Sequence, residues 1–195
     1  MQKFLTLVLL ALSMQVTAQT LESRLQANTE FRADFDQAIY DENGVLSQSS
    51  SGISMVKSPN KLRWESVSPW QQLMVVNGST GWLYDPDFNQ ATYYSISQDF
   101  SANPATILAN SYSDITRLFD VSQLTENRFK FTPTVESQFV SIEIEFYDTH
   151  VTELSFIDVL GQRTRISFSN HVAEPLADQL FEFTPPSDAE VIYSE

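Results

Sequence analysis

The segment FVSIEIEFY, residues Phe139–Tyr147, decides the fold class of this chain. Its apolar side chains recur at every second position, at Val140, Ile142, Ile144 and Phe146. Serine and glutamate fill the positions between them. Because successive side chains of a β-strand point to opposite faces, this alternation predicts a strand with one buried and one exposed face.

The same period of two recurs along most of the chain. It is visible at Ile53 and Met55, Leu62 and Trp64, Leu154 and Phe156, and Ile166 and Phe168. Further strands are predicted over 71–76, 81–85 and 90–95, which are rich in β-branched and aromatic residues. We expect about ten to twelve strands, and their short connections favour antiparallel neighbours.

Turn and helix signals punctuate these strands. The pairs Asn43-Gly44 and Asn77-Gly78 favour hairpin turns in which both residues have positive φ. Thr20 is expected to cap a helix that begins at Leu21 and buries Leu21 and Leu25 on one face.

Two more helical stretches are predicted in the middle of the chain. Asn103-Pro104 places a good capping residue before a residue suited to the first helical position, which predicts a short helix over 105–110. Ser113 is expected to cap a further turn that carries Ile115 and Leu118. The predicted fold is therefore mainly β (α+β), with one curved antiparallel sheet and short helices packed on one face.

The apolar face of such a sheet has to be covered. Two or three short helices cover a concave face only in part, or cover it and move away, which favours an apolar ligand cavity with a helical lid. A fully packed core that binds nothing is the alternative, because apolar stripes usually mark core.

The first residues have the layout of a secretory signal peptide, predicted over 1–18. Met1-Gln2-Lys3 is a short basic start, residues 4–12 are apolar, and Val16-Thr17-Ala18 is typical of a cleavage site before Gln19. The apolar run is too short to span a bilayer, and no second long run follows it. We therefore expect an exported protein with a single domain over residues 19–195.

Composition excludes several function classes. The net charge of −14 argues against a nucleic-acid-binding protein, which needs a basic surface. The absence of cysteine excludes thiol catalysis, zinc-thiolate sites and lipid attachment through Cys. The acidic balance serves solubility, or alternatively steers the protein toward basic partner surfaces.

Four segments, in order, resemble the LolA family of periplasmic outer-membrane lipoprotein carriers. They are GISMVKSPNKLRW (52–64), NGSTGWLYDP (77–86), Asn103-Pro104 with Ile107-Leu108, and FEFTPP (181–186), the last matching the family's terminal strand. The resemblance spans about residues 21–186 and implies an unclosed β-barrel capped by helices. It also implies carriage of acylated lipoproteins by a monomer, from an inner-membrane ABC transporter to an outer-membrane acceptor, with only transient contact to these membrane proteins.

The resemblance implies the residues that face the acyl chains, and each could instead be ordinary core. The matched positions are Leu25, Phe31, Leu62, Trp64, Ile107 and Leu108. We expect a hydrocarbon-lined hollow beneath residues 104–118, closed by movable helical turns.

The sequence also departs from the family pattern. The family's arginine before Pro-Asn, which latches the lid, is replaced by Ser58. We expect a weaker latch here, or a replacement supplied by Lys57, Lys61 or Arg63.

Catalytic and metal-binding interpretations find little support. His150 and His171 are expected on the surface, and the sequence holds no Gly-x-Ser-x-Gly motif. Asp85-x-Asp87-x-Asn89 imitates a calcium loop, but Gln90 replaces the required glycine, so a turn is expected. We expect no enzymatic activity, metal or cofactor. The alternatives to a carrier are a lipid- or lipoprotein-sensing module of the same fold and an envelope ester hydrolase.

Overall fold

The protein contains one twelve-stranded sheet, seen in a computed structural model that describes residues 20–95 and 104–194. The strands are β1 (Glu30–Tyr40), β2 (Leu46–Lys57), β3 (Lys61–Ser68), β4 (Gln72–Asn77), β5 (Thr80–Asp85), β6 (Gln90–Ser95), β7 (Phe119–Gln123), β8 (Arg128–Pro133), β9 (Phe139–Tyr147), β10 (His150–Asp158), β11 (Arg163–Val172) and β12 (Glu190–Ser194). Their order across the sheet is β12-β6-β5-β4-β3-β2-β1-β11-β10-β9-β8-β7. The predicted signal peptide lies outside the described residues. No helix in the described ranges is long and apolar enough to cross a membrane.

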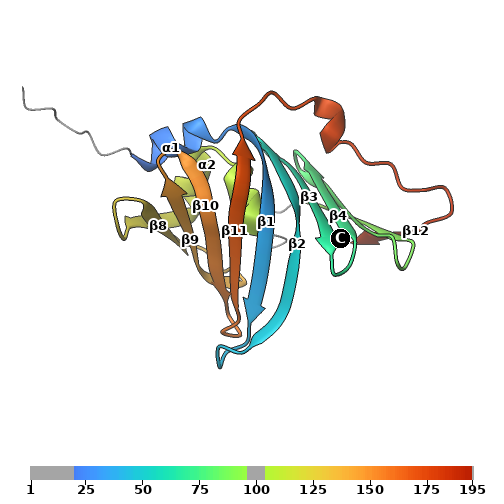
Figure 1. The fold of residues 1–195 in the computed structure, drawn as a ribbon, viewed down its shortest axis with the longest axis horizontal. Helices are drawn as coiled ribbons and strands as arrows, with labels where there is room; N and C mark the ends of the chain where they lie inside the picture. The colour runs from blue at the N-terminus through green and yellow to red at the C-terminus, as the bar shows by residue number, and fades with distance from the viewer. Residues whose placement is uncertain (1–19, 96–103, 195) are drawn as a thin grey trace, which may run out of the picture.

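The sheet is arched and does not close, because β7 and β12 remain as separate edges (Figure 1). The predicted mainly β architecture and unclosed barrel are therefore confirmed. One strand departs from the antiparallel prediction, since β12 pairs with β6 in parallel. Residues 173–189, which we call the C-terminal strap, lead from β11 to β12 at the far edge of the sheet.

The predicted terminal strand at 181–186 is wrong. Phe181 ends η2 (Asp178–Phe181), a short 3-10 helix, and the chain then continues without strand pairing to Glu190. The actual last strand is the exposed segment β12, which lies beyond the matched motif.

Three short helices cover one end of the concave face (Figure 1). α1 (Leu21–Ala27) begins as predicted, and the Thr20 hydroxyl accepts a hydrogen bond from the Ser23 amide at 3.2 Å. η1 (Pro104–Ala109) is a 3-10 helix with all six residues buried. Its predicted cap, Asn103, lies outside the described residues.

The cap predicted for the third helix is wrong. α2 (Tyr112–Leu118) is capped by Ser111, whose side chain accepts a hydrogen bond from the Asp114 amide at 3.2 Å. Ser111 has extended backbone angles, as a capping residue requires, whereas Ser113 already lies within the first helical turn. A periodic pattern places such a helix but does not fix its first residue.

Burial alternates along β9 from Ile142 onward but not before it, where Val140 is exposed and Ser141 is buried. Ile142, Ile144 and Phe146 are buried, but Val140 is 54% exposed. The pairing with β10 shifts between Ile157 and Asp158, which leaves Val140 in a bulge. Because an extra residue reverses the side-chain direction, Val140 does not face the core as predicted.

Both predicted hairpin turns exist, but their geometry differs from the prediction. Asn77 still pairs with Thr80, so Gly78 and Ser79 are the central residues and Gly78 alone has positive φ, at 66°. This is the pattern of a turn with glycine first. In the longer β1–β2 connection, Gly44 has a φ of 80° and Asn43 does not share it.

Candidate functional site

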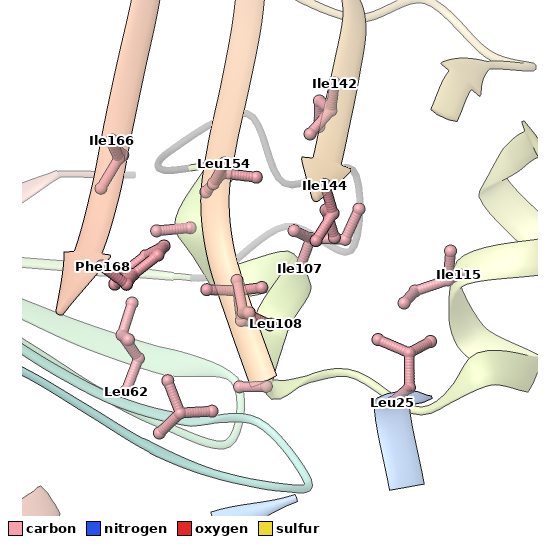
Figure 2. Close-up of a cluster of buried hydrophobic side chains, with 14 of the residues drawn as sticks. Leu25, Leu62, Ile107, Leu108, Ile115, Ile142, Ile144, Leu154, Ile166 and Phe168 are labelled. Carbon is pink, nitrogen blue, oxygen red and sulfur yellow. The ribbon is translucent and has the colours of Figure 1, made fainter. Parts of the chain in front are cut away.

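The predicted acyl-facing residues form one apolar cluster at the helical end of the concave face. Their exposed fractions are 7% or less, and all belong to the same buried core: Leu25, Phe31, Leu62, Trp64, Ile107 and Leu108. Figure 2 shows Leu25 facing Ile115 of α2. The structure therefore brings together residues that are up to 83 positions apart in sequence, from Leu25 to Leu108.

η1 contributes buried side chains to the apolar core of the protein. Ile107 is fully buried and Leu108 is 4% exposed, and both belong to the same buried cluster as Ile144 and Leu154 of the sheet (Figure 2). A side chain that lines an enclosed cavity is as buried as one in a packed core, so the hollow expected beneath residues 104–118 stays a prediction.

A cavity opens further along the same concave face, away from η1. It has a volume of about 750 Å³, and Trp64 and Met74 form its apolar floor. Trp70 and Phe88 stand on its rim with exposed fractions of 69% and 79%. Since Trp64 also belongs to the buried cluster, the cavity and the core beneath η1 share one wall.

The close packing of Phe35 against Trp64, which lines the cavity, depends on Gly52. The rings of Phe35 and Trp64 stack with centroids 3.9 Å apart. A Cβ atom at position 52 would lie 1.9 Å from the carbonyl oxygen of Glu65 and 2.9 Å from the Phe35 ring. Only glycine permits this approach.

η1 is attached to the sheet through the backbone of the β2–β3 turn. The Asn60 amide donates a hydrogen bond to the Ala109 carbonyl at 2.8 Å. The Asn60 carbonyl in turn accepts a hydrogen bond from the Gly78 amide at 2.9 Å. Ser58, at the position of the family's arginine, donates its backbone amide to Thr29 at 2.6 Å. No side-chain signal could have revealed this attachment, because it uses backbone atoms.

The predicted replacement latch lies on the opposite, convex face and holds the C-terminal strap. Lys57 Nζ donates to the Leu176 carbonyl at 2.7 Å and lies 2.9 Å from an Asp178 carboxylate oxygen. Lys61 Nζ is 3.0 Å from the same oxygen, and Arg63 donates to the Leu180 carbonyl at 3.3 Å. None of these contacts reaches η1 or α2.

Electrostatics reinforce this attachment. Hydrogen bonds from Lys57 and then Lys61 lower the pKa of Asp178, and the Asp178 bond raises the pKa of Lys57. The Leu176 amide donates to Glu30 at 2.5 Å and lowers the pKa of the Glu30 carboxyl. The strap is thus held by charges that stay ionised at neutral pH.

The strap also covers apolar residues on the convex face. Phe181 is 1% exposed, and the Phe183 ring lies 5.4 Å from Tyr84 and 5.8 Å from Trp82 between centroids. Sequence reasoning assigned Phe181 and Phe183 to a strand and missed this role. The sequence signal for this role was the close spacing of aromatic and proline residues around Phe181 and Phe183.

His171 is not the solvated residue that was predicted. Its ring stacks on Phe31 at 4.6 Å and lies 4.5 Å from His150, and its Nε2 is 3.2 Å from Asn28 Oδ1. Burial, and then the neighbouring His150, lower the pKa of His171 to about 4. His150 is exposed, as expected.

The remaining chemical candidates have structural roles. Asp85 Oδ1 accepts hydrogen bonds from the amides of Asp87 and Phe88 at 3.1 and 3.3 Å, which confirms the predicted turn. In the ranges that the structure describes, no group of three or more His, Cys, Asp or Glu side chains could hold a metal ion.

A family model described as outer membrane lipoprotein carrier protein LolA matches residues 26–184. The chain belongs to the LolA family. The resemblance inferred from the four ordered segments is therefore confirmed.

Members of the LolA family with similar sequences cover nearly the whole chain. The outer-membrane lipoprotein carrier protein of Coxiella burnetii (strain CbuK_Q154) is 32% identical over 187 residues, or 92% of this chain and 89% of that protein. The protein of the same name from Methylibium petroleiphilum is 34% identical over 167 residues, or 83% of this chain and 81% of that protein.

A solved structure shares the fold. The uncharacterized conserved protein from Thermus thermophilus has a TM-score of 0.52 at 17% identity, covering 88% of this chain and 95% of its own. At that identity the likeness shows the fold alone.

Proposed function

We propose that this protein is a periplasmic carrier of acylated lipoproteins. It would receive them from an inner-membrane ABC transporter and deliver them to an outer-membrane acceptor, acting by binding rather than by catalysis. Membership of the LolA family and the names of its relatives support this role.

One structural observation carries the proposal: a buried apolar concave face is covered by a short helix. Each buried CH₂ group of an acyl chain is worth about 0.8 kcal/mol, so long chains require an apolar shelter to cross water. Leu62, Trp64 and the sheet residues beneath η1 offer that shelter once η1 moves aside. When the carrier is empty, η1 hides the same surface and limits aggregation.

The attachment of η1 suits repeated opening. A 3-10 helix has poorer hydrogen-bond geometry than an α-helix, and η1 has only six residues. Apart from Thr106, the side chains of η1 are apolar, so acyl chains of similar character can replace them at the sheet.

The decisive test starts from inner-membrane vesicles that contain the ABC transporter, radiolabelled lipoprotein and ATP. The purified protein is added, and labelled lipoprotein is measured in the soluble fraction and then in added outer membranes. We expect soluble lipoprotein to appear in a complex with this protein. Folded protein that releases no lipoprotein would contradict the proposal.

A matched pair of variants shows where the cargo binds. Leu108→Glu places a charge on the buried face of η1, whereas Leu124→Glu places one on a side chain that is 48% exposed in the β7–β8 turn. We expect Leu108→Glu to abolish transfer and Leu124→Glu to leave it unchanged, with circular dichroism confirming that both variants fold.

A further inference from the structure

The concave face changes from apolar to polar along its strands. On β1, Phe35 is followed two positions later by Gln37 on the same face, and on β3 Trp64 is followed by Ser66. On β4, which runs the other way, Gln72 lies beside Ser66 and Met74 beside Trp64. The change therefore occurs at one level across neighbouring strands.

This polar end coincides with the 750 Å³ cavity. Besides Trp64 and Met74 on its floor, its wall carries amide and hydroxyl side chains, which we call the polar mouth: Gln37, Gln48, Ser50, Ser66, Gln71 and Gln72. Such groups donate and accept hydrogen bonds without charge. A cavity of this size holds one small ligand or the head of a larger one.

The charged side chains that line this cavity, within the described part of the chain, have one sign. Asp85 and Asp87 line the cavity, and no lysine, arginine or histidine is among its described lining residues. A carboxylate or phosphate placed there would be repelled and would find no basic partner. Esters and amides, in contrast, meet donors and acceptors.

We propose that the polar mouth binds the ester- and amide-bearing head of the acylated cargo and rejects anionic amphiphiles. The head is the linkage between the hydrocarbon chains and the first peptide groups, and the chains extend from it along Trp64 and Met74 toward the core beneath η1. This inference rests on the proposed carrier function. It explains how the site can prefer lipoprotein to fatty acids and acidic phospholipids, which also carry long chains.

The test uses synthetic lipopeptides with one acylated cysteine and identical chains. They differ only in the residue after the cysteine, which is Ser, Lys or Glu, and their C-termini are amidated. Palmitate and phosphatidylglycerol complete the series, and competition with a fluorescent acyl probe gives the affinities. We expect the Glu lipopeptide to bind about tenfold more weakly than the Ser lipopeptide at low salt.

Two variants with matched controls link the selectivity to the polar mouth. Asp87→Asn should reduce the difference in affinity between the Glu and Ser lipopeptides. Asp120→Asn, at an exposed position of β7, should leave that difference unchanged. Gln72→Leu should lower the affinity for the Ser lipopeptide but not for a plain hydrocarbon probe. Gln162→Leu, at an exposed position, should change neither affinity.

Equal affinities for the Ser and Glu lipopeptides, or selectivity unaffected by both Asp87→Asn and Gln72→Leu, would overturn the inference. If vesicle transfer then still succeeded, the carrier function would stand without it. Failure to bind any acyl ligand, together with failed vesicle transfer, would overturn both.

Discussion

Two buried isoleucines of one apolar cluster distinguish a movable cover from a fixed core. Ile107 belongs to η1 and Ile144 to β9, and both are fully buried (Figure 2). Replacing either with alanine removes the same atoms and costs about 2–5 kcal/mol of packing free energy. If η1 opens as a unit, the packing free energy lost in Ile107→Ala affects the opening of η1, and that lost in Ile144→Ala affects global unfolding.

For Ile107→Ala, the loss falls mainly on the closed position of η1. A loss of about 3 kcal/mol raises the open population about 100-fold, while the global free energy of unfolding falls much less. For Ile144→Ala, the loss falls on the sheet and lowers global stability by the full amount. Hydrogen exchange at 104–110 measures the opening of η1, and binding of a hydrophobic dye measures the apolar surface that the opening exposes. Urea unfolding measures the global free energy of unfolding. Equal losses of global stability, with unchanged dye binding in both variants, would refute this reasoning.

Three further predictions concern the rest of the fold. Gly52→Ala should lower the free energy of unfolding by several kcal/mol, because its Cβ would lie 1.9 Å from the Glu65 carbonyl, and a small change in the thermal midpoint would contradict this. The pKa of His171 falls to about 4, below its ordinary value of 6.5, so the unfolded chain binds more protons between these values. Stability should therefore decline as the pH falls from 6.5 toward 4, and His171→Phe should flatten that part of the pH profile; a profile unchanged by the variant would exclude His171 as the cause. Asp178→Asn should release the C-terminal strap and speed proteolysis within 173–189 at neutral pH, because the lowered pKa keeps Asp178 ionised there. The control is Asp188→Asn at an exposed position of the strap. Equal cleavage rates in the two variants would show that Asp178 does not hold the strap.

The sheet and the apolar cluster were predictable because their signals are local. Alternation at Leu62 and Trp64, and at Ile142 and Ile144, fixes which side chains share a face without reference to any partner. The ordered motifs then supplied the family and the unclosed barrel. Val140 shows the limit of this reasoning, since a single bulge residue reversed its direction.

The attachments of η1 and of the C-terminal strap were not predictable for a different reason. η1 is bound by the backbone of Asn60, and a backbone hydrogen bond leaves no mark in residue type. Lys57 and Lys61 were predicted to latch the lid, whereas their observed partner Asp178 lies in the strap, more than 100 positions away. Which segment they hold depends on the side of the sheet on which the strap crosses, and alternation does not determine that crossing.

Reversible locking of η1 tests the central claim most directly. The natural chain has no cysteine, so Asn60→Cys with Ala109→Cys introduces the only pair, at backbone positions already joined by a 2.8 Å hydrogen bond. Disulfide formation is verified by the loss of free thiols, and lipoprotein release from vesicles is measured before and after reduction. We predict that the oxidised protein takes up no lipoprotein and that reduction restores uptake. Equal uptake by the oxidised and reduced protein would show that cargo does not enter beneath η1.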